Sequence, residues 1–465
     1  MKKLIVFALG VLLSTDLILG GYSVAQAVGL IQNSPQAYDG YTLFAPKHNT
    51  ITYLINNEGR VINSWESDYE PGQSVYLLEN GHLLHCNFTK NQGFIGGGEG
   101  GGIEEYDWEG NLVWDFWYTS DKYLMHHDIE PLPNGNILAL VVEKKTYDEC
   151  IAAGFNPQML RDKELFPDYV IEIERTGTNG GIIVWEWHVW DHLIQDYDPS
   201  KANYGDVASH RELIDANGSG RQTRAFWNHM NSIDYNDVLD QILLSVRGNS
   251  EIWVIDHSTT TEEAAGHTGG RYSKGGDLLY RWGNPQTYRA GDTSDQQLFD
   301  QHDAQWIPGG HPGEGNILIF NNGLRRPGGE HSTVEEIVPP VDNYGNYALS
   351  FGSTYGPKEP EWVYRAENPT DFYSEAISGC QRLPNGNTLI CDGVHGVFFE
   401  VTSGGEIVWK YVNPVAGTGP ISEGEAIPLD HRGHQMNAVF KILRYRPDYP
   451  GLIGKDLTPG APVER

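Results

Sequence analysis

The chain has 465 residues, of which 39% are hydrophobic and 11% aromatic, so it is long and apolar enough to form a packed globular protein. Its 32 Lys and Arg residues stand against 62 Asp and Glu residues, which gives a formal net charge of −30. That charge excludes nucleic acid and anionic lipid surfaces as expected partners. A small anionic ligand would need a local cluster of cations.

Residues 1–27 have the pattern of a secretory signal peptide. Lys2 and Lys3 precede an apolar run over residues 4–13, and Ala25-Gln26-Ala27 forms a small-x-small cleavage site. A retained membrane anchor is the alternative, but the unbroken run is shorter than the ~20 residues of a spanning helix. We therefore expect export to the periplasm or the medium, without stable membrane insertion.

Hairpins recur along the rest of the chain. The turn Pro-Asn-Gly-Asn occurs at residues 133–136 and 384–387, each time before an apolar strand. Alignment on these turns gives five units, whose first strands begin at Gln73, His127, His229, His302 and Ser378. A second pair of strands follows most of these hairpins. Four short antiparallel strands per unit, joined by glycine-bearing turns, predict an all-β fold of the β-propeller type.

A sixth blade is expected to be split between the two ends of the chain. Residues 436–446 supply one strand, and residues 40–46, 52–56 and 60–65 supply three. Their pairing would close a six-bladed ring and leave no open sheet edge. Two separate β-sandwiches are the alternative, but no linker divides the repeats. We expect one propeller domain over residues 28–448 and a surface tail over residues 449–465.

Two insertions interrupt the repeat. Residues 143–168 carry a helix-like segment, and residues 191–226 form a long loop that leads into His229. Because loops of this length are uncommon unless functional or disordered, we expect both at the mouth of the ring. The glycine run over residues 96–102 lacks the Lys-Ser/Thr of a phosphate-binding loop and predicts only a mobile connection.

Four cysteines are too few for a disulfide scaffold, although an exported protein can form one or two bridges. If Asn385-Gly386 is a two-residue turn, Cys380 and Cys391 lie opposite each other in a hairpin. Two buried free thiols are an equally weighted alternative. Cys86 and Cys150 carry no pairing signal.

Three of the five units begin their first strand with a histidine, namely His127, His229 and His302. The innermost strands of a propeller surround its axis, so equivalent positions on different blades face one central funnel. Residues 229–235 and 241–247 form a hairpin that returns Arg247 to the edge where His229 lies. The sequence thus predicts three imidazoles and one guanidinium on the axis. A structural, hydrogen-bonded histidine is the alternative at each position.

Residues beside these histidines have weaker signals. His126 should face away from the funnel, because side chains alternate along a strand. Asp128 and Asp303 directly follow His127 and His302. Each aspartate either orients an imidazole or makes a turn or interblade hydrogen bond.

Three further residues are candidates for the mouth of the funnel. His434 lies near the corresponding place in the sixth blade but one residue out of register, and Arg325 or Arg326 could reach the mouth from a neighbouring hairpin. We count His434 and Arg325, together with Arg247, as candidate substrate-binding residues. A solvent-exposed position is the favoured alternative for the arginines at 325 and 326.

The segments that carry these residues resemble the bacterial aryl-sulfate sulfotransferases, and the likeness covers nearly the whole expected mature chain. The matching segments are HHDIEPLPNGN, HMNSIDYN, LLSVRGNSEIWVID, QHDAQWIP, IFNNG and QRLPNGNTLI. The resemblance implies a six-bladed propeller that moves a sulfuryl group from an aryl sulfate donor to a phenolic acceptor. It also implies that the reaction needs no 3'-phosphoadenylyl sulfate, metal or other cofactor.

The same resemblance implies roles for the site residues. His302 matches the family's nucleophile, which becomes a sulfohistidine, and His127, His229 and Arg247 match the residues around it. Better-known members carry a separate N-terminal strand domain, for which this chain has little room before its first blade strand. Many members have Ser-Ser-Arg where this chain has Ser245-Val246-Arg247, which keeps the arginine.

Two other classes of function stay open. Three histidines on an axis could hold zinc or iron, although Arg247 argues against it because a cation beside a metal centre is unfavourable. A propeller could also be a non-catalytic binding or structural module, whose function would lie in its surface loops.

Overall fold

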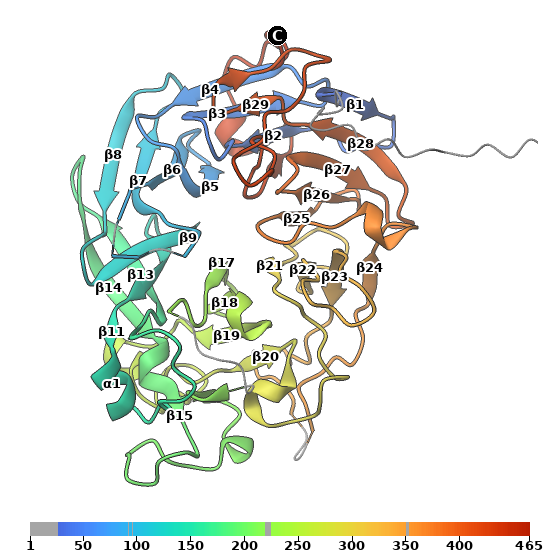
Figure 1. The fold of residues 1–465 in the computed structure, drawn as a ribbon. Helices are drawn as coiled ribbons and strands as arrows, with labels where there is room; N and C mark the ends of the chain where they lie inside the picture. Colours follow the sequence, from blue (N-terminus) through green and yellow to red (C-terminus); the bar gives the residue numbers. More distant parts are fainter. Residues whose placement is uncertain (1–26, 92, 95, 219–224, 350–352) are drawn as a thin grey trace, which may run out of the picture.

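The computed structural model describes residues 27–465 except 92, 95, 219–224 and 350–352. Six β-sheets stand in a ring around a central axis, which confirms the predicted six-bladed β-propeller (Figure 1). The predicted signal peptide lies outside the described residues, apart from Ala27. Among the described residues, no helix is long and apolar enough to cross a membrane.

Five blades have four antiparallel strands and one, blade V, has five; we number the blades I to VI from the first complete one along the chain. Blade I comprises β5 (Pro71–Leu77), β6 (Leu83–Phe88), β7 (Gly101–Tyr106) and β8 (Leu112–Trp117). Blade II comprises β9 (Tyr123–Pro131), β10 (Ile137–Glu143), β13 (Asp168–Arg175) and β14 (Gly181–His188). Blade III comprises β17 (Met230–Asn236), β18 (Gln241–Val246), β19 (Glu251–Asp256) and β20 (Tyr280–Trp282). Blade IV comprises β21 (His302–Trp306), β22 (Ile317–Asn321), β23 (Thr333–Ile337) and β24 (Trp362–Tyr364). Blade V contains β25 (Gly379–Arg382), β26 (Thr388–Asp392), β27 (Val397–Val401) and β28 (Ile407–Val412). Blade VI comprises β31 (Leu443–Tyr445), β2 (Tyr41–Phe44), β3 (Ile51–Asn56) and β4 (Val61–Glu66).

The hydrophobic core lies between neighbouring blades rather than on the axis. Six clusters of buried side chains each join one blade to the next around the ring. The indoles of Trp187, Trp253 and Trp409 are fully buried in these clusters. Strands β18 and β19 are buried at every position, because both faces of a middle strand pack against other blades. The axis is thereby left to polar side chains.

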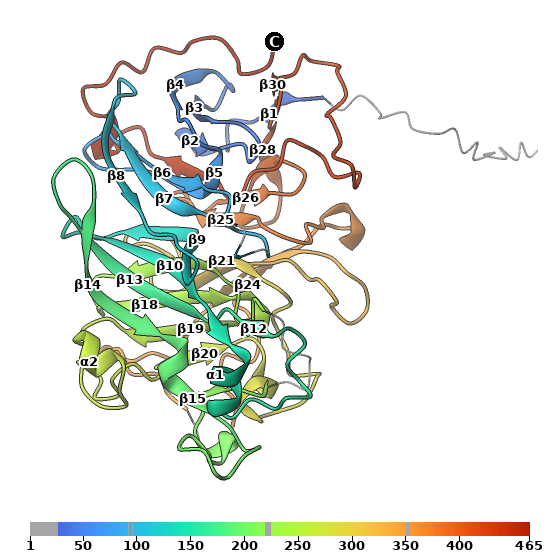
Figure 2. The ribbon, with the colours of Figure 1, turned by 60° about the vertical axis from the view of Figure 1, so that its left-hand side comes forward.

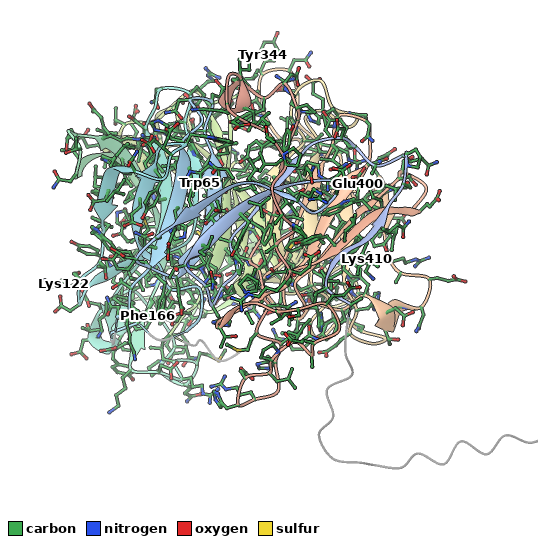
Figure 3. The ribbon with its side chains drawn as sticks, turned by 90° about the horizontal axis from the view of Figure 1, so that it is seen from above. Trp65, Lys122, Phe166, Tyr344, Glu400 and Lys410 are labelled. Carbon is green, nitrogen blue, oxygen red and sulfur yellow. The ribbon has the colours of Figure 1, made fainter. Side chains whose placement is uncertain are left out.

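The ring closes as predicted, by pairing the two ends of the chain in blade VI. β31 pairs with β2 from Tyr41↔Tyr445 to Leu43↔Leu443. The buried guanidinium of Arg444 also forms an ion pair with Glu400 on β27, so the closing strand is bonded to blade V as well. Figure 3 views this closure from outside, with Trp65 of β4 on one side and Glu400 on the other. An additional strand, β1 (Gly29–Asn33), extends blade V by pairing with β28, which the sequence did not predict.

Ending the chain at Gln435 is expected to abolish cooperative unfolding, because it removes β31, exposes the edge of β2 in blade VI and leaves Glu400 of blade V without Arg444. Differential scanning calorimetry of the truncated protein should show a broad transition without a sharp peak. The substitution Arg446→Ala, at an exposed side chain just after β31, is the control and should shift stability by no more than about 0.5 kcal/mol. A sharp transition in the truncated chain would contradict this account of ring closure.

Of the two alternatives for Cys380 and Cys391, the structure has buried free thiols, and all four cysteines are free. The expectation that these two residues lie directly opposite each other is wrong. The connection at Asn385-Gly386 is longer than a two-residue turn, as the amide of Leu383 donates to the carbonyl of Asn387. This loop pairs Cys380 with Ile390 and Gly379 with Cys391. The two thiols are therefore offset by one residue and point to opposite faces of the blade.

The insertion within blade II is helical as expected. It contains β11 (Lys145–Thr146), α1 (Tyr147–Ala152) and β12 (Glu164–Leu165). Thr146 and Glu149 form a reciprocal capping box at the start of α1. Phe155 and Leu165 are buried against blades II and III, so the insertion is packed rather than free.

The insertion between blades II and III also has local structure. Its elements are η1 (Val189–His192), β15 (Leu193–Ile194), η2 (Val207–Ser209) and β16 (Ile214–Asp215). The remaining short elements are η4 (Arg247–Asn249), α2 (Thr261–Ala264), η5 (Pro285–Tyr288), η6 (Pro369–Asp371), β29 (Val415–Ala416), β30 (Gly419–Pro420) and η7 (Pro450–Leu452). In the tail, Leu452 and Val463 are buried against blades VI and V.

Candidate functional site

Most innermost strands begin with an irregular step near the axis. Gln73, His127, His229, Asp303 and Ser378 all have positive φ angles, and four of these strands shift register there. A left-handed residue in a strand makes a β-bulge, which redirects the side chains beside it. The sequence alignment located these steps at nearly the same residues. In blade IV, however, Asp303 rather than His302 adopts the left-handed conformation.

The three predicted histidines surround one region of the axis. The rings of His127 and His229 meet edge to face, with centroids 4.9 Å apart. The fully buried ring of Phe440 lies 6.0 Å from His127 and 6.5 Å from His302. His127 and His302 are themselves buried. Blades II, III and IV thus each contribute one imidazole to a single site.

The prediction that His126 faces away from the site is wrong. Because the left-handed backbone of His127 interrupts strand alternation, Nδ1 of His126 lies 2.7 Å from Nδ1 of His127. Nε2 of His126 lies 3.0 Å from Oδ1 of the buried Asp168, in a contact without straight hydrogen-bond geometry. The same Oδ1 accepts a hydrogen bond from the backbone amide of Met230. Asp168 thereby fixes the residues next to both His127 and His229, a role that sequence reasoning missed.

His302 is held by an amide that sets its tautomer. Nδ1 of His302 lies 2.7 Å from Oδ1 of Asn322. The Nδ2 group of Asn322 donates to the carbonyls of Ser374 and Ile377, which assigns Oδ1 as the atom that faces the imidazole. Nδ1 of His302 is therefore the protonated nitrogen, and Nε2 carries the lone pair. Asn322 follows β22 directly and was not predicted.

Arg247 lies where the hairpin prediction put it. β17 and β18 pair from Met230↔Val246 to Asn236↔Gln241, so Arg247 ends beside His229. Its guanidinium is 3.4 Å from Oδ1 of Asp300 and remains 23% exposed. The other oxygen of Asp300 pairs with Arg325, whose side chain is 55% exposed. Asp300 thus connects the inner cation to an outer one at the mouth.

Lys47 is a second cation near the histidines, and sequence reasoning missed it. It follows β2 in blade VI, where its amide donates to the carbonyl of Ala438. Burial lowers the pKa of Lys47, while Glu99 and Glu70 act in the opposite direction. Its charge also helps to lower the pKa of His127 and of His302, so it acts on the same site.

All three imidazoles are uncharged at neutral pH. Burial and then the charge of Arg247 lower the pKa of His302 from 6.5 to about 3. Burial and then the same guanidinium hold the pKa of His229 well below its ordinary value. For His127 the pKa falls because of burial and then the neighbouring His229. The site combines neutral nitrogen lone pairs with two fixed cations.

Asp128 and Asp303 make interblade contacts, the second of the two roles predicted for them. Lys441, next to Phe440 in the chain, lies 2.9 Å from Asp128 and 3.5 Å from Asp303. The hydroxyl of Tyr76 donates to Asp128, and the amide of Cys380 donates to Asp303. These carboxylates therefore join blades around the axis and compensate a buried ammonium.

The glycine run over residues 96–102 covers part of the site rather than forming a free connection. The carbonyl of Gly98 accepts a hydrogen bond from the amide of His127. A Cβ on Gly98 would lie 1.8 Å from Cε1 and 2.0 Å from Nε2 of that imidazole. Phe226, at the end of the long insertion, lies 5.8 Å from the His229 ring and packs against Gly96. Both segments therefore reach the histidines.

Gly98→Ala is expected to lower kcat/KM by about 10- to 100-fold, because the new methyl group must displace the His127 imidazole or the loop. Gly97→Ala is the matched control. Gly97 has a similar φ of +90°, against +78° for Gly98, but a Cβ there meets nothing within 4 Å. Both variants share the backbone cost of about 1 kcal/mol. Equal activities in the two variants would show that the close approach of Gly98 to the His127 imidazole does not matter for activity.

His434 and Arg326 lie in other environments. The His434 ring contacts Asp430 of its own loop, and the His434 side chain is 55% exposed. Arg326 donates to Thr333 and pairs with Glu335, so it stabilises the β22–β23 connection. A substrate contact by His434 stays a prediction.

The fold and this geometry define a β-propeller with a histidine-lined, cationic site on its axis. Comparison with known families identifies it more closely: the family model for arylsulfotransferase (ASST) matches residues 28–416, and the chain belongs to that family. It is 24% identical to the arylsulfate sulfotransferase AssT of Escherichia coli, over an alignment that covers 76% of this chain and 58% of that protein. The chain thus spans less than two thirds of that relative.

Solved structures show weaker similarity. A Bacteroides caccae protein of unknown function matches with a TM-score of 0.47 and 11% identity, covering 88% of this chain and 99% of that one. A streptogramin B lyase matches with a TM-score of 0.40 and 10% identity, covering 91% and 95%.

Proposed function

We propose that this protein transfers a sulfuryl group from an aryl sulfate ester to a phenolic acceptor through a sulfohistidine at His302. The observation that carries the proposal is the neutral, oriented imidazole of His302 beside the fixed cations Arg247 and Lys47. Membership of the arylsulfotransferase family supports the reaction class. The proposal includes export of the protein, small aryl sulfate and phenol as its substrates, and independence from 3'-phosphoadenylyl sulfate.

In the first half-reaction, Nε2 of His302 attacks the sulfur of the donor. A nitrogen–sulfur bond forms, the bond between sulfur and the aryl oxygen breaks, and the phenolate leaves with the electron pair. The positive charge on the imidazole is balanced by the negative charge of the sulfo group, and Asn322 keeps its hydrogen bond to Nδ1–H. No proton has to leave His302 before it attacks, because its pKa keeps it neutral.

The cations act on the sulfuryl oxygens. Sulfuryl transfer resembles phosphoryl transfer in that charge is spread over three non-bridging oxygens while attacking and leaving atoms stand in line. Arg247 presents a planar fork suited to two of these oxygens, and Lys47 adds a point charge. Such preorganised donors commonly give the largest single contribution to catalysis.

In the second half-reaction, a phenol takes the sulfuryl group from His302. Its hydroxyl proton passes to His127 or His229, a new oxygen–sulfur bond forms, and the nitrogen–sulfur electron pair returns to Nε2. Either imidazole can accept a proton because each is neutral. The same group can return that proton to the departing phenolate in the next turnover.

The decisive assay mixes the purified, chelator-treated protein with a chromogenic aryl sulfate, with and without a phenol. Release of the coloured phenol should depend on the acceptor and need no nucleotide. Ping-pong kinetics, with parallel lines in double-reciprocal plots, should accompany it. A non-catalytic propeller would show no turnover, and a metal-dependent enzyme would lose turnover after chelation.

The pH dependence tests the neutral nucleophile. kcat/KM for the donor reports the free enzyme and should stay within about twofold between about pH 7 and about pH 5. An acid limb near 6.5, the ordinary imidazole value, would contradict the lowered pKa of about 3 for His302. The depressed folded-state pKa contributes stability above pH 6.5 that is lost as the pH falls toward about 3, so Tm must be followed at each pH.

A further inference from the structure

A second group of histidine and carboxylate side chains lies away from the axis. Among the residues that the structure describes, His192, His267 and Asp277 are the group whose ligand atoms all lie within 4.8 Å of one another. His192 belongs to η1 of the long insertion after blade II, while His267 and Asp277 both lie in the loop between α2 and β20 in blade III. Figure 2 shows α2 at the margin of the molecule, apart from the inner strands β9 and β21.

The tautomer of His192 makes this group unusual. Its ring is fully buried, and Nε2 lies 2.8 Å from the carbonyl oxygen of Ala264. A carbonyl can only accept, so Nε2 carries the proton and a neutral His192 has its lone pair on Nδ1. That lone pair faces Oδ1 of Asp277 at 2.9 Å. Two acceptors this close require either a shared proton or a metal ion between them.

His267 completes the arrangement on the solvent side. Its Nδ1 lies 2.7 Å from the same Oδ1 of Asp277, and its side chain is 59% exposed. Two imidazole nitrogens and one carboxylate oxygen are ligands that zinc accepts, at about 2.0–2.2 Å each. Tetrahedral geometry at those lengths separates neighbouring ligand atoms by roughly 3.3 Å. The two histidine–Asp277 separations of 2.9 and 2.7 Å would each have to open by a few tenths of an ångström, and the exposed His267 side chain can move to meet an ion.

The surroundings of His192 match those of a metal ligand. A ligating histidine commonly donates its other ring nitrogen to a carbonyl or carboxylate, which fixes its orientation, and Ala264 does this here. The ring also stacks on Trp187, whose indole donates to the carbonyl of Gly276 just before Asp277. His192 is thus rigid, whereas the exposed side of the group leaves room for a water as fourth ligand. The net charge of −30 favours a cation.

We propose that His192, His267 and Asp277 bind a divalent transition-metal ion, with Zn²⁺ as the best match to two imidazoles and one carboxylate. The ion would join the insertion after blade II to the α2–β20 loop of blade III, at the outer margin of the propeller. This site is separate from the axial histidines and plays no part in the proposed sulfuryl transfer.

Co²⁺ is the direct probe, because four-coordinate Co²⁺ gives intense visible absorption bands. Untagged full-length protein, treated with chelator and then titrated with Co²⁺, should bind one equivalent with these bands. Zn²⁺ should displace it and raise Tm by roughly 1–3 °C. Isothermal titration with Zn²⁺ gives the affinity independently of enzyme activity.

Variants locate the ion. His267→Ala, at an exposed side chain that should not affect folding, is expected to lower Zn²⁺ affinity at least about tenfold and to remove the Co²⁺ bands. His302→Ala, on the axis, should keep both, and His210→Ala, at another exposed histidine paired with a carboxylate, should keep both as well. Absence of binding, unchanged affinity in His267→Ala, or loss of the bands in His302→Ala would each overturn the proposal.

Discussion

His302→Ala is expected to lower kcat/KM for transfer from aryl sulfate to phenol by at least about 10³-fold, because it removes the proposed nucleophile. Because His302 is buried, its loss also leaves a cavity and an unpaired amide on Asn322. His302→Gln is the companion variant, since its side-chain amide keeps a donor for Asn322 and fills much of the space. Both variants should be equally inactive even where His302→Gln has a Tm close to that of the unmodified protein.

The covalent intermediate gives the more specific test. Incubation with donor and no phenol should add one sulfo group per chain, and peptide mapping under mildly alkaline conditions should place it on His302. Addition of a phenol should then discharge it. A label on His229 or His127 would reassign the nucleophile, and intersecting kinetic lines without any label would replace the double displacement by direct transfer.

The ring and its closure could be predicted because the signals are local. Each hairpin has its own turn residues and a run of strand-forming residues. Five such units can be counted along the chain, so the strands that remain at its two ends must form the sixth blade together. β1 was missed because its five residues GLIQN have only a weak strand pattern and gain their partner, β28, from a distant part of the chain. Tertiary pairing of this kind leaves no mark in a short segment.

The site could be predicted in part. The positions of His127, His229 and Arg247 could be predicted from the repeat and from hairpin geometry. Equivalent residues of the repeat lie at the same edge of each blade, and a hairpin returns the end of its second strand to the edge where its first strand begins. His126 was misplaced because strand alternation holds only while the backbone stays extended, and the φ of 52° at His127 interrupts it. The expected register of Cys380 opposite Cys391 was wrong for a similar reason, because one extra residue in the turn shifts every cross-strand pair by one position.

Lys47 and Asn322 share a signal that could have found them. Arg247 and Asn322 directly follow the second strands of blades III and IV, and Lys47 comes three residues after the second strand of blade VI. The second strand of every blade runs toward the same rim as the start of the first. An alignment of the residues that follow the second strand of each blade would therefore have identified these polar side chains as candidates for the axial site.

Arg247→Lys is expected to lower kcat by about 100-fold, because it keeps the positive charge but loses the planar fork that can hold two sulfuryl oxygens. The charge of Arg247 also lowers the pKa of His302, and lysine would keep much of that effect. The loss should therefore appear in the rate of sulfation of His302 and not in its pH dependence.

Arg325→Lys is the matched control, because Arg247 and Arg325 each pair with one oxygen of Asp300. If Arg247 served only to compensate the buried Asp300, both substitutions would have similar small effects, because lysine keeps the positive charge that this carboxylate needs. If Arg247 holds the donor, its substitution should slow single-turnover sulfation about 100-fold, while Arg325→Lys changes it by less than about threefold. Equal rates in the two variants would remove Arg247 from the transfer step and leave Lys47 as the cation that acts on the sulfuryl oxygens.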